Sequence, residues 1–187
     1  GDDNLEGKRV LVQGIGHVGE SLVEHITNEG AEVIISDINQ ERLEYVRDTY
    51  GASIYGGSDI YSEDVDIYAP CALGATVNDE TIHKIKAKVI AGAANNQLED
   101  ENKHGKILQD RGIVYAPDFL INAGGIINVY AELEGYDKKE IIRKTENIFN
   151  TTLEILNSAD VNKITTHTAA LQIAQQRIAT RKMENEG

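Results

Sequence analysis

Cysteine is almost absent from the chain: Cys71 is the single one among 187 residues, which excludes an intrachain disulfide framework. A lone free thiol suits a reducing compartment, so we expect a cytoplasmic protein. Long apolar runs are absent too, since none approaches the roughly 18 residues of a membrane-spanning helix. The sequence has no recognisable signal peptide, low-complexity segment or internal repeat. The composition therefore favours one globular domain with a substantial core.

Basic residues are scarce, with 18 lysines and arginines against 31 acidic residues and a net charge of −13. Nucleic acids and anionic membranes are bound through basic patches, so this charge disfavours both classes of partner. Three acidic residues are close enough in sequence to suggest a carboxylate or metal site: Glu63, Asp64 and Asp66. We interpret Glu63 and Asp64 instead as a solvated loop before a strand, and we expect no metal.

The most informative stretch covers residues 8–37. An apolar, β-branched run at 10–12 is too short for a helix and is typical of a buried parallel strand. Three glycines with G-x-G-x-x-G spacing follow it: Gly14, Gly16 and Gly19. An amphipathic helix then continues until Gly30, and a second apolar strand at 31–36 ends just before Asp37. Strand, glycine turn, helix, strand and acid together predict a dinucleotide-binding βαβ unit.

Each residue type in this unit has a physical reason. Gly14 permits the tight turn, Gly16 lets the backbone approach a pyrophosphate, and Gly19 lets helix and strand pack closely. The free N–H groups at the start of the helix face the phosphates, and the helix dipole favours negative charge there. Asp37 is placed to accept hydrogen bonds from ribose hydroxyls and to repel the 2′-phosphate of NADP, although Arg42 nearby weakens that preference. The alternative is a purely structural βαβ turn.

The rest of the chain continues the alternation of strands and helices. We expect further strands at 52–55, 66–72, 89–94 and 112–116. We expect further helices at 40–50, at 78–85 with Asn78 as its N-cap, up to 109 with an interruption at Gly105, and at 126–133, 138–157 and 168–183. This pattern predicts an α/β fold, a Rossmann-type doubly wound and mostly parallel sheet of order 3-2-1-4-5-6, with extra C-terminal helices.

We divide the chain into three segments. Residues 1–7 have no initiator methionine and lead directly into the first strand, so we interpret them as a linker remnant of an excised or processed fragment. Residues 8–135 form the nucleotide-binding core, and residues 136–187 form C-terminal helices that pack on it within a single domain. We expect the apolar stripes of the last two helices, which include Phe149 and Leu153, to be core or packing surface.

Polar or reactive side chains follow three of the expected strands. Three consecutive amides come directly after the strand at 89–94: Asn95, Asn96 and Gln97. Their donors and acceptors suit a ribose, a carboxamide or a substrate, and the alternative is an Asx-turn that caps the next helix. Asn122 precedes the small residues 123–125, which allow close backbone approach. Cys71 has no neighbouring base in the sequence, so we interpret it as a small buried residue beside the cofactor rather than a nucleophile.

Three longer segments carry a family resemblance: DIYAPCALGA (66–75), IAGAANNQL (90–98) and YAPDFLINAGGIINV (115–129). They resemble the Glu/Leu/Phe/Val dehydrogenase family, in particular its leucine-type members, and the similarity extends over nearly all of the chain. The resemblance implies reversible oxidative deamination of a branched-chain L-amino acid to a 2-oxo acid, with hydride transfer to NAD. It also implies a two-domain enzyme with its active site between the domains, and a homo-oligomeric parent protein.

The resemblance further assigns candidate site residues. Those implied beside the cofactor NAD are Gly14, Gly16, His17, Val18, Gly19, Asp37, Ile38, Cys71, Ala72, Ala93, Asn95, Asn96 and Asn122. Those implied beside the amino-acid substrate are Asn96, Asn122, Ile126 and Val129. A hydrophobic pocket of this kind separates side chains that differ by one methylene by only ~1–3 kcal/mol.

No residue of this chain is implied to be catalytic. The family's catalytic lysines and its acid–base aspartate belong to the preceding domain, in a glycine-rich lysine motif that this sequence lacks. Lysines such as Lys8, Lys84, Lys106 and Lys163 belong to expected surfaces. We therefore expect the chain to bind NAD without turnover, and an amino-acid substrate only together with the missing domain. Two alternatives stay open: a nucleotide-sensing or interaction module without enzymatic activity, and a methyltransferase-like sheet for another adenosine ligand.

Overall fold

The computed structural model describes residues 4–134 and 137–186 and is built around one sheet of six parallel strands. The strands are β1 (Arg9–Gln13), β2 (Glu32–Ser36), β3 (Ser53–Ile54), β4 (Ile67–Pro70), β5 (Val89–Ile90) and β6 (Val114–Tyr115). Their order is β3-β2-β1-β4-β5-β6, and every neighbouring pair is parallel. The predicted Rossmann-type fold and strand order are confirmed, and the order reverses between β1 and β4.

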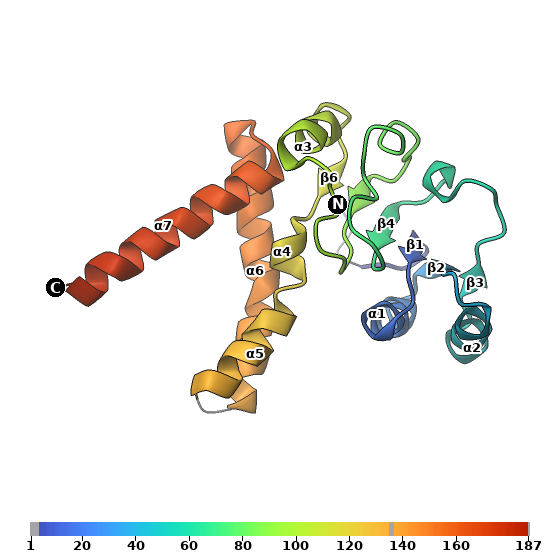
Figure 1. The fold of residues 1–187 in the computed structure, drawn as a ribbon, viewed down its shortest axis with the longest axis horizontal. Coiled ribbons are helices and arrows are strands. Elements are labelled where there is room, and N and C mark those ends of the chain that lie inside the picture. Colours follow the sequence, from blue (N-terminus) through green and yellow to red (C-terminus); the bar gives the residue numbers. More distant parts are fainter. Residues whose placement is uncertain (1–3, 135–136, 187) are drawn as a thin grey trace.

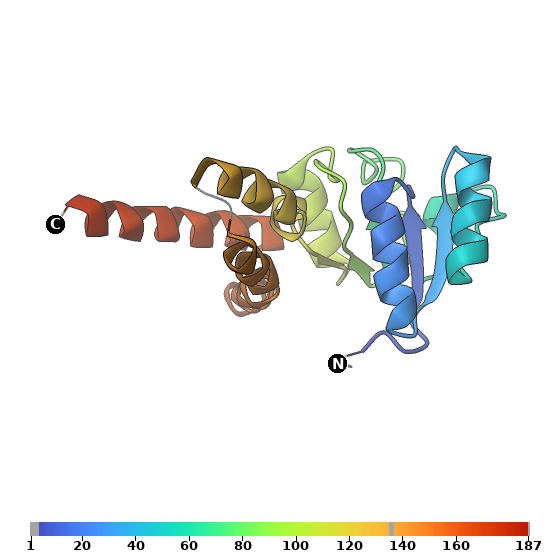
Figure 2. The ribbon, with the colours of Figure 1, turned by 90° about the horizontal axis from the view of Figure 1, so that it is seen from below.

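Helices cover both faces of this sheet (Figures 1 and 2). They are α1 (His17–Asn28), α2 (Gln40–Tyr50), the 3-10 helix η1 (Ile60–Ser62), α3 (Glu101–Asp110), α4 (Asp118–Ile121), α5 (Gly124–Glu134), α6 (Lys138–Asn162) and α7 (Thr166–Glu186). Successive residues of a strand point to opposite faces. Val10 and Val12 of β1 accordingly pack in one core with Val23 of α1, whereas Leu11 packs in a second core with Leu108 of α3. The central strand is therefore buried on both sides, as its apolar run predicts.

Several elements differ in extent from the prediction. The strands β3, β5 and β6 contain two residues each, whereas the sequence predicts longer ones. Hydrogen bonds from Ala91 N to Tyr68 O and from Ala94 N to Pro70 O, both 3.0 Å, prolong the contact of β5 with β4. The helix α3 continues through the buried Gly105 without the predicted interruption. The helix α6 extends to Asn162, beyond the predicted end at 157.

The predicted helix at 78–85 is wrong, because the structure forms consecutive turns there. Asn78 does cap this segment, since its Oδ1 accepts a hydrogen bond from the backbone N–H of Thr81 at 3.1 Å. The side chains of Asn78 and Thr81 also donate to the carbonyls of Ala75 and Thr76, at 2.8 and 2.6 Å. Side chains that bond the nearby backbone compete with the i to i+4 pairs of a helix, and here they hold a series of turns.

The helices α5, α6 and α7 form a layer beyond β6 (Figure 1). The first part of α7 packs on α6, where Ala169 and Ala170 are buried with Ile155, and the rest of α7 projects away from the body (Figure 2). The apolar stripe of α6 is only partly core, because Phe149 and Leu153 are exposed, and their role as packing surface stays a prediction. The reason is that α6 turns the adjacent face, which carries Ile155, toward its neighbours.

The predicted segment boundaries are only partly covered by the described residues. Residues 1–3 of the expected linker remnant and the boundary at 135 and 136 lie outside them. The division into a core and C-terminal helices therefore stays a prediction. Within the part of the chain that the structure describes, no helix combines the length and hydrophobicity needed to cross a membrane.

Tyr68 on β4 is expected to make the fold sensitive to alkaline pH. Its side chain is buried in the sheet, and its hydroxyl donates a hydrogen bond to Oε1 of Gln13. Burial raises the pKa of Tyr68 well above its ordinary value. The folded state thus holds this proton more tightly than the unfolded chain, so its contribution to stability is complete below about pH 10 and is lost as the pH rises further.

Urea unfolding of the original chain and of Tyr68→Phe measures this contribution. At about pH 8 the variant should lose about 1 kcal/mol, because Gln13 loses its donor. At about pH 11 the loss should shrink, because ionisation of the unfolded tyrosine now destabilises only the original chain. An equal loss at both pH values would contradict the role of the Tyr68 hydroxyl.

Candidate functional site

The candidate site lies where the carboxyl ends of β1 and β4 meet. Gly14 follows β1 with a φ of +96°, and a Cβ on it would lie 2.5 Å from the Cβ of Ala72, which follows β4. Its N–H donates to the carbonyl of Ser36 at the end of β2, at 2.7 Å. A residue without a side chain is required here by both the backbone angle and the space. Three strand ends therefore converge at the point where the sheet order reverses, which is where open α/β sheets bind ligands.

The start of α1 is open to solvent. Gly16 is the N-cap of this helix and has no side chain that could cap it, and no atom lies within 4 Å of the position that a Cβ would take. His17 and Val18 in the first turn are exposed. By contrast, a Cβ on Gly19 would lie 2.0 Å from the carbonyl oxygen of Gly14, so α1 and the turn are packed backbone to backbone. The free N–H groups of such a helix start can bind an anion.

The carboxylate of Asp37 lies beside this glycine turn. Its Oδ2 accepts a hydrogen bond from the backbone N–H of Ile15 at 2.8 Å, and its Oδ1 accepts one from Asn39 at 2.9 Å. Ile38 between them is fully exposed. A carboxylate has about four lone-pair sites, so Asp37 can accept further hydrogen bonds from a ligand.

Arg42 also reaches the glycine turn, but it is already paired. Its Nη2 lies 2.6 Å from Oε2 of Glu20, and its Nε donates to the carbonyl of Ile15. The guanidinium charge beside the glycine turn is thus paired with a carboxylate within the protein.

Three segments meet at the amide loop, which comprises residues 91–97 and follows β5. The side-chain N–H of Asn122 donates to Oδ1 of Asn95 at 2.6 Å and to the carbonyl of Ala93 at 3.4 Å. The N–H of Ala93 donates to Sγ of Cys71 at 3.5 Å. Burial raises the pKa of the Cys71 thiol, so this cysteine stays protonated near neutral pH. Its environment is that of a packing residue rather than a nucleophile.

The amide loop is also joined to the loop after β4. Asn96 has a φ of +52°, and its carbonyl accepts a hydrogen bond from the N–H of Ala75 at 2.7 Å. The side chains of Asn95 and Asn96 are exposed, whereas that of Gln97 is fully buried. Of the three consecutive amide side chains, only those of Asn95 and Asn96 are therefore accessible to a ligand from solvent.

The structure thus joins most of the candidate residues into one strip. Contacts link Asp37 to the glycine turn, the turn to Ala72, Cys71 to Ala93, and Ala93 and Asn95 to Asn122. Ile126 and Val129 lie on α5 with 71% and 60% of their surface exposed, and no contact that we describe joins them to this strip. Their role in a substrate pocket stays a prediction.

Asp118, which sequence analysis missed, and Gln97, which it counted among three candidate amides, hold the strip together. Oδ2 of Asp118 accepts a hydrogen bond from the N–H of Gln97 at 3.2 Å, and Oδ1 accepts one from Phe119 at the start of α4. Gln97 bonds to the amide loop from inside. An acid after Pro117 at a helix start is a recognisable capping signal, but its second bond to a distant loop has no signal in the sequence.

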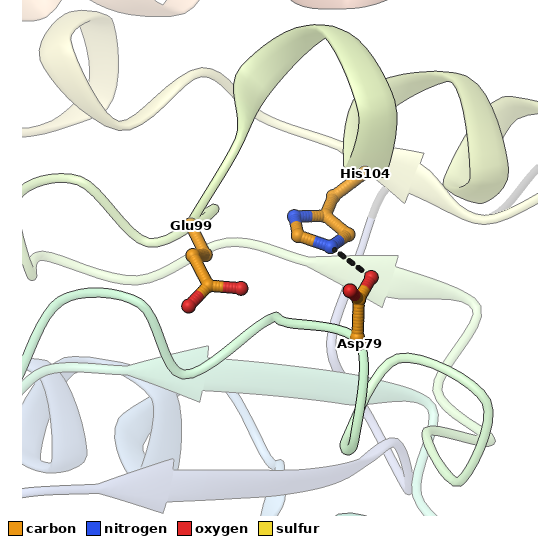
Figure 3. Close-up of side chains that lie close together, drawn as sticks. All are labelled: Asp79, Glu99 and His104. Carbon is orange, nitrogen blue, oxygen red and sulfur yellow. Dashed lines mark hydrogen bonds and ion pairs between the residues drawn. The ribbon is translucent and has the colours of Figure 1, made fainter.

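A separate cluster has the composition of a metal site (Figure 3): Asp79, Glu99 and His104. Nδ1 of His104 accepts a hydrogen bond from the backbone N–H of Asp100 at 3.0 Å, so the proton of the neutral ring is on Nε2. Nε2 lies 3.0 Å from Oδ1 of Asp79, and Lys103 pairs with the same oxygen at 2.6 Å. The hydrogen bonds from Lys103 and His104 lower the pKa of Asp79. Because a metal would need Nε2 unprotonated, the cluster fits a clamp between the turns and α3 rather than a metal.

A hollow of about 590 Å³ lies elsewhere on the sheet. Arg9, Glu32 and Ser53 are among the residues that line it, at the amino-terminal ends of β1 and β2. Parallel α/β sheets bind ligands at the carboxyl ends of their strands, so position favours the glycine turn over this hollow.

Comparisons with known proteins agree with this geometry. The sequence model of the glutamate/leucine/phenylalanine/valine dehydrogenase family matches residues 35–187. A leucine dehydrogenase of Bacillus cereus is 50% identical over 182 residues, which are 97% of this chain and 50% of that protein. The crystal structure of L-tryptophan dehydrogenase from Nostoc punctiforme has a TM-score of 0.93 at 43% identity, over 97% of this chain and 55% of that chain.

A more distant match extends the likeness of fold. Hetero-hexameric glutamate dehydrogenase from Thermus thermophilus has a TM-score of 0.71 at 19% identity, over 93% of this chain and 46% of that chain. The family resemblance predicted from three sequence segments is confirmed. The chain spans about half the length of the curated relatives that it matches.

Gly16 and Gly19 allow a matched test of the geometry. Gly19→Ala places a methyl group 2.0 Å from the carbonyl oxygen of Gly14, so we expect a loss of about 3 kcal/mol in the free energy of unfolding. Gly16→Ala places its methyl group in open space and should cost no more than about 1 kcal/mol. Urea unfolding of both variants measures the difference, and equal losses would contradict the crowding at Gly19.

Proposed function

Because this chain belongs to the glutamate/leucine/phenylalanine/valine dehydrogenase family, we propose that it is the NAD-binding part of a leucine-type L-amino-acid dehydrogenase. Such an enzyme oxidatively deaminates a branched-chain L-amino acid to a 2-oxo acid, reversibly. The observation that carries the proposal is the open start of α1 beside Asp37, at the point where the sheet order reverses.

The residues of the strip fit a dinucleotide from one end to the other. The N–H groups after Gly16 would bind the pyrophosphate, and Asp37 would accept hydrogen bonds from the adenosine ribose. Asn95, Asn96 and Asn122 present amides that suit the carboxamide of the nicotinamide. When bound, the dinucleotide supplies the hydride acceptor at its nicotinamide ring.

The amino-acid substrate would lie beyond the nicotinamide end. We propose that Asn96 and Asn122 bind its polar end and that Ile126 and Val129 contact its side chain. Both apolar residues are exposed on α5, where a ligand can reach them. Since a hydrophobic surface discriminates weakly between aliphatic side chains, leucine, isoleucine and valine are proposed as one substrate class.

The chemistry of proton transfer requires groups from outside these 187 residues. Deamination needs a lysine or another base with a perturbed pKa close to the reacting carbon. Lys84, Lys106 and Lys163 are instead paired with Asp59, Asp110 and Asp160 at 3.2, 2.5 and 2.9 Å, on exposed surfaces. We propose that the acid–base groups belong to the half of the relatives' length that this chain does not match.

The complete enzyme is proposed to be a homo-oligomer in the cytoplasm. Apolar side chains of α6 and α7 are exposed and available for contacts, among them Phe149, Ile178 and Met183. The one cysteine, Cys71, is free, as is typical of proteins in a reducing compartment.

Preference for NAD over NADP tests the role of Asp37. We expect at least about tenfold tighter binding of NAD in calorimetric titrations, because Asp37 repels a 2′-phosphate and Arg42 is paired with Glu20. Asp37→Asn should weaken NAD about tenfold or more and reduce the preference, since it removes a charged acceptor. Asp48→Asn, on the exposed surface of α2, is the matched control with the same change of charge. Tighter binding of NADP by the original chain would refute the assignment.

A turnover assay tests whether the acid–base groups lie outside this chain. Mixed with L-leucine and NAD, the 187-residue chain should form no NADH above the rate without protein, although it binds NADH in the same preparation. Leucine oxidation near the rate of a full-length leucine dehydrogenase would contradict this proposal. The alternative of a nucleotide-sensing module without activity predicts that no reading frame for a catalytic half precedes this segment in its genome.

A further inference from the structure

The side chain of Gln97 is fully buried, although the two residues before it, Asn95 and Asn96, are exposed. Its Nε2 donates to the carbonyl of Gly92 at 2.5 Å and to the carbonyl of Ala94 at 3.0 Å. Because carbonyls only accept hydrogen bonds, the NH₂ group must be the end that faces them. Both hydrogens of this group are thus used in bonds within the amide loop. They join Gln97 to Gly92 and Ala94, which precede it by five and three positions.

The backbone of the amide loop is held from outside as well. Its contacts there include those with β4 through Pro70, with the loop after β4 through Ala75 and Val77, and with α4 through Asp118. Gln97 takes part in two of these contacts, since its N–H donates to Asp118 at 3.2 Å and its carbonyl accepts from Val77 at 3.0 Å. Among the described residues, Gln97 is the one whose side chain bonds the loop from within.

Two features set the buried Gln97 and its loop apart from ordinary core packing. Oε1 of Gln97 is buried and accepts from no described residue, which costs stability that an apolar side chain would not lose. Asn96 adopts a φ of +52°, in the left-handed region that few residues other than glycine take and that asparagine takes more readily than most. The bonds of Gln97 to Gly92 and Ala94 join residues on either side of Asn95 and Asn96 in the chain.

We infer that Gln97 is a positioning residue for the nicotinamide end of the dinucleotide, acting through Asn95, Asn96 and Asn122. This inference rests on the proposed function. The side chain of Gln97 sets the course of the amide loop, and Asn95 in turn bonds Asn122 at 2.6 Å. The glycine turn and Asp37, which would bind the other half of the ligand, make no described bond to Gln97.

The separation of the two halves gives a test that a purely structural role would not pass. ADP-ribose contains the adenosine, pyrophosphate and ribose groups of NAD but lacks the nicotinamide. In calorimetric titrations of the full 187-residue chain, Gln97→Met should weaken NAD about tenfold while the affinity for ADP-ribose stays within about twofold. The fluorescence of bound NADH should shift toward that of free NADH, because the nicotinamide is held less firmly.

Two further variants make the outcome decisive. Gln97→Glu keeps the size of the side chain but cannot donate when ionised, so it should give the same split between NAD and ADP-ribose. Ile85→Val loses a methyl group in the core beside Val65, at a residue with no described hydrogen bond to the amide loop, and should lower stability without changing that ratio.

A parallel loss of both ligands in both Gln97 variants would show that Gln97 only supports the fold, and would overturn the inference alone. Unchanged affinity for NAD in Gln97→Met would overturn it equally. If the original chain bound neither NAD nor ADP-ribose, the proposed function would fail, and the inference with it.

Discussion

The structure depends on the close packing of backbones at the glycine turn, where there is no room for a side chain. At the end of β1, the backbones of the glycine turn, of Ala72 after β4 and of the first turn of α1 lie so close that a Cβ on Gly14 or Gly19 would overlap them. Close packing of backbones brings three segments of the chain to one point with their N–H and C=O groups still available. The open start of α1 and the positions of Asp37 and Cys71 all follow from this convergence.

The local sequence pattern was sufficient to predict the fold, and it also pointed to the glycine turn and Asp37 as one half of the candidate site. The apolar run at 10–12, the glycine spacing and Asp37 each specify a conformation within a few residues, so the order of the strands could be predicted from them. Long-range packing decided the rest. Asn96 and Gln97 are neighbours with similar side chains, yet one faces solvent and the other is buried, because Gly92 and Ala94 curve around Gln97. In α6 the sequence marks Phe149 as apolar, but the contact with α7 selects the face of Ile155.

Electrostatics explain how a chain with a net charge of −13 can suit an anionic ligand. Among the cations described here, Arg42 is paired with Glu20, and Lys84, Lys106 and Lys163 are paired with carboxylates. Backbone N–H groups and the dipole of α1 act over about one helical turn and leave the overall field of the molecule negative. A ligand with two phosphates inside a small, specific site is thus compatible with a surface that repels polyanions such as nucleic acids.

The two bonds of Asp37 to Ile15 and Asn39 have a consequence for how cofactor preference can evolve. The same carboxylate that we propose to bind the ribose also anchors the glycine turn to the end of β2. A mutation that replaces this acid to admit a 2′-phosphate leaves the N–H of Ile15 without its acceptor, so the first step toward a new cofactor is also a step toward a looser turn. A lineage that changes specificity here therefore needs a compensating residue that restores the anchor, and the two substitutions are expected to appear as an epistatic pair.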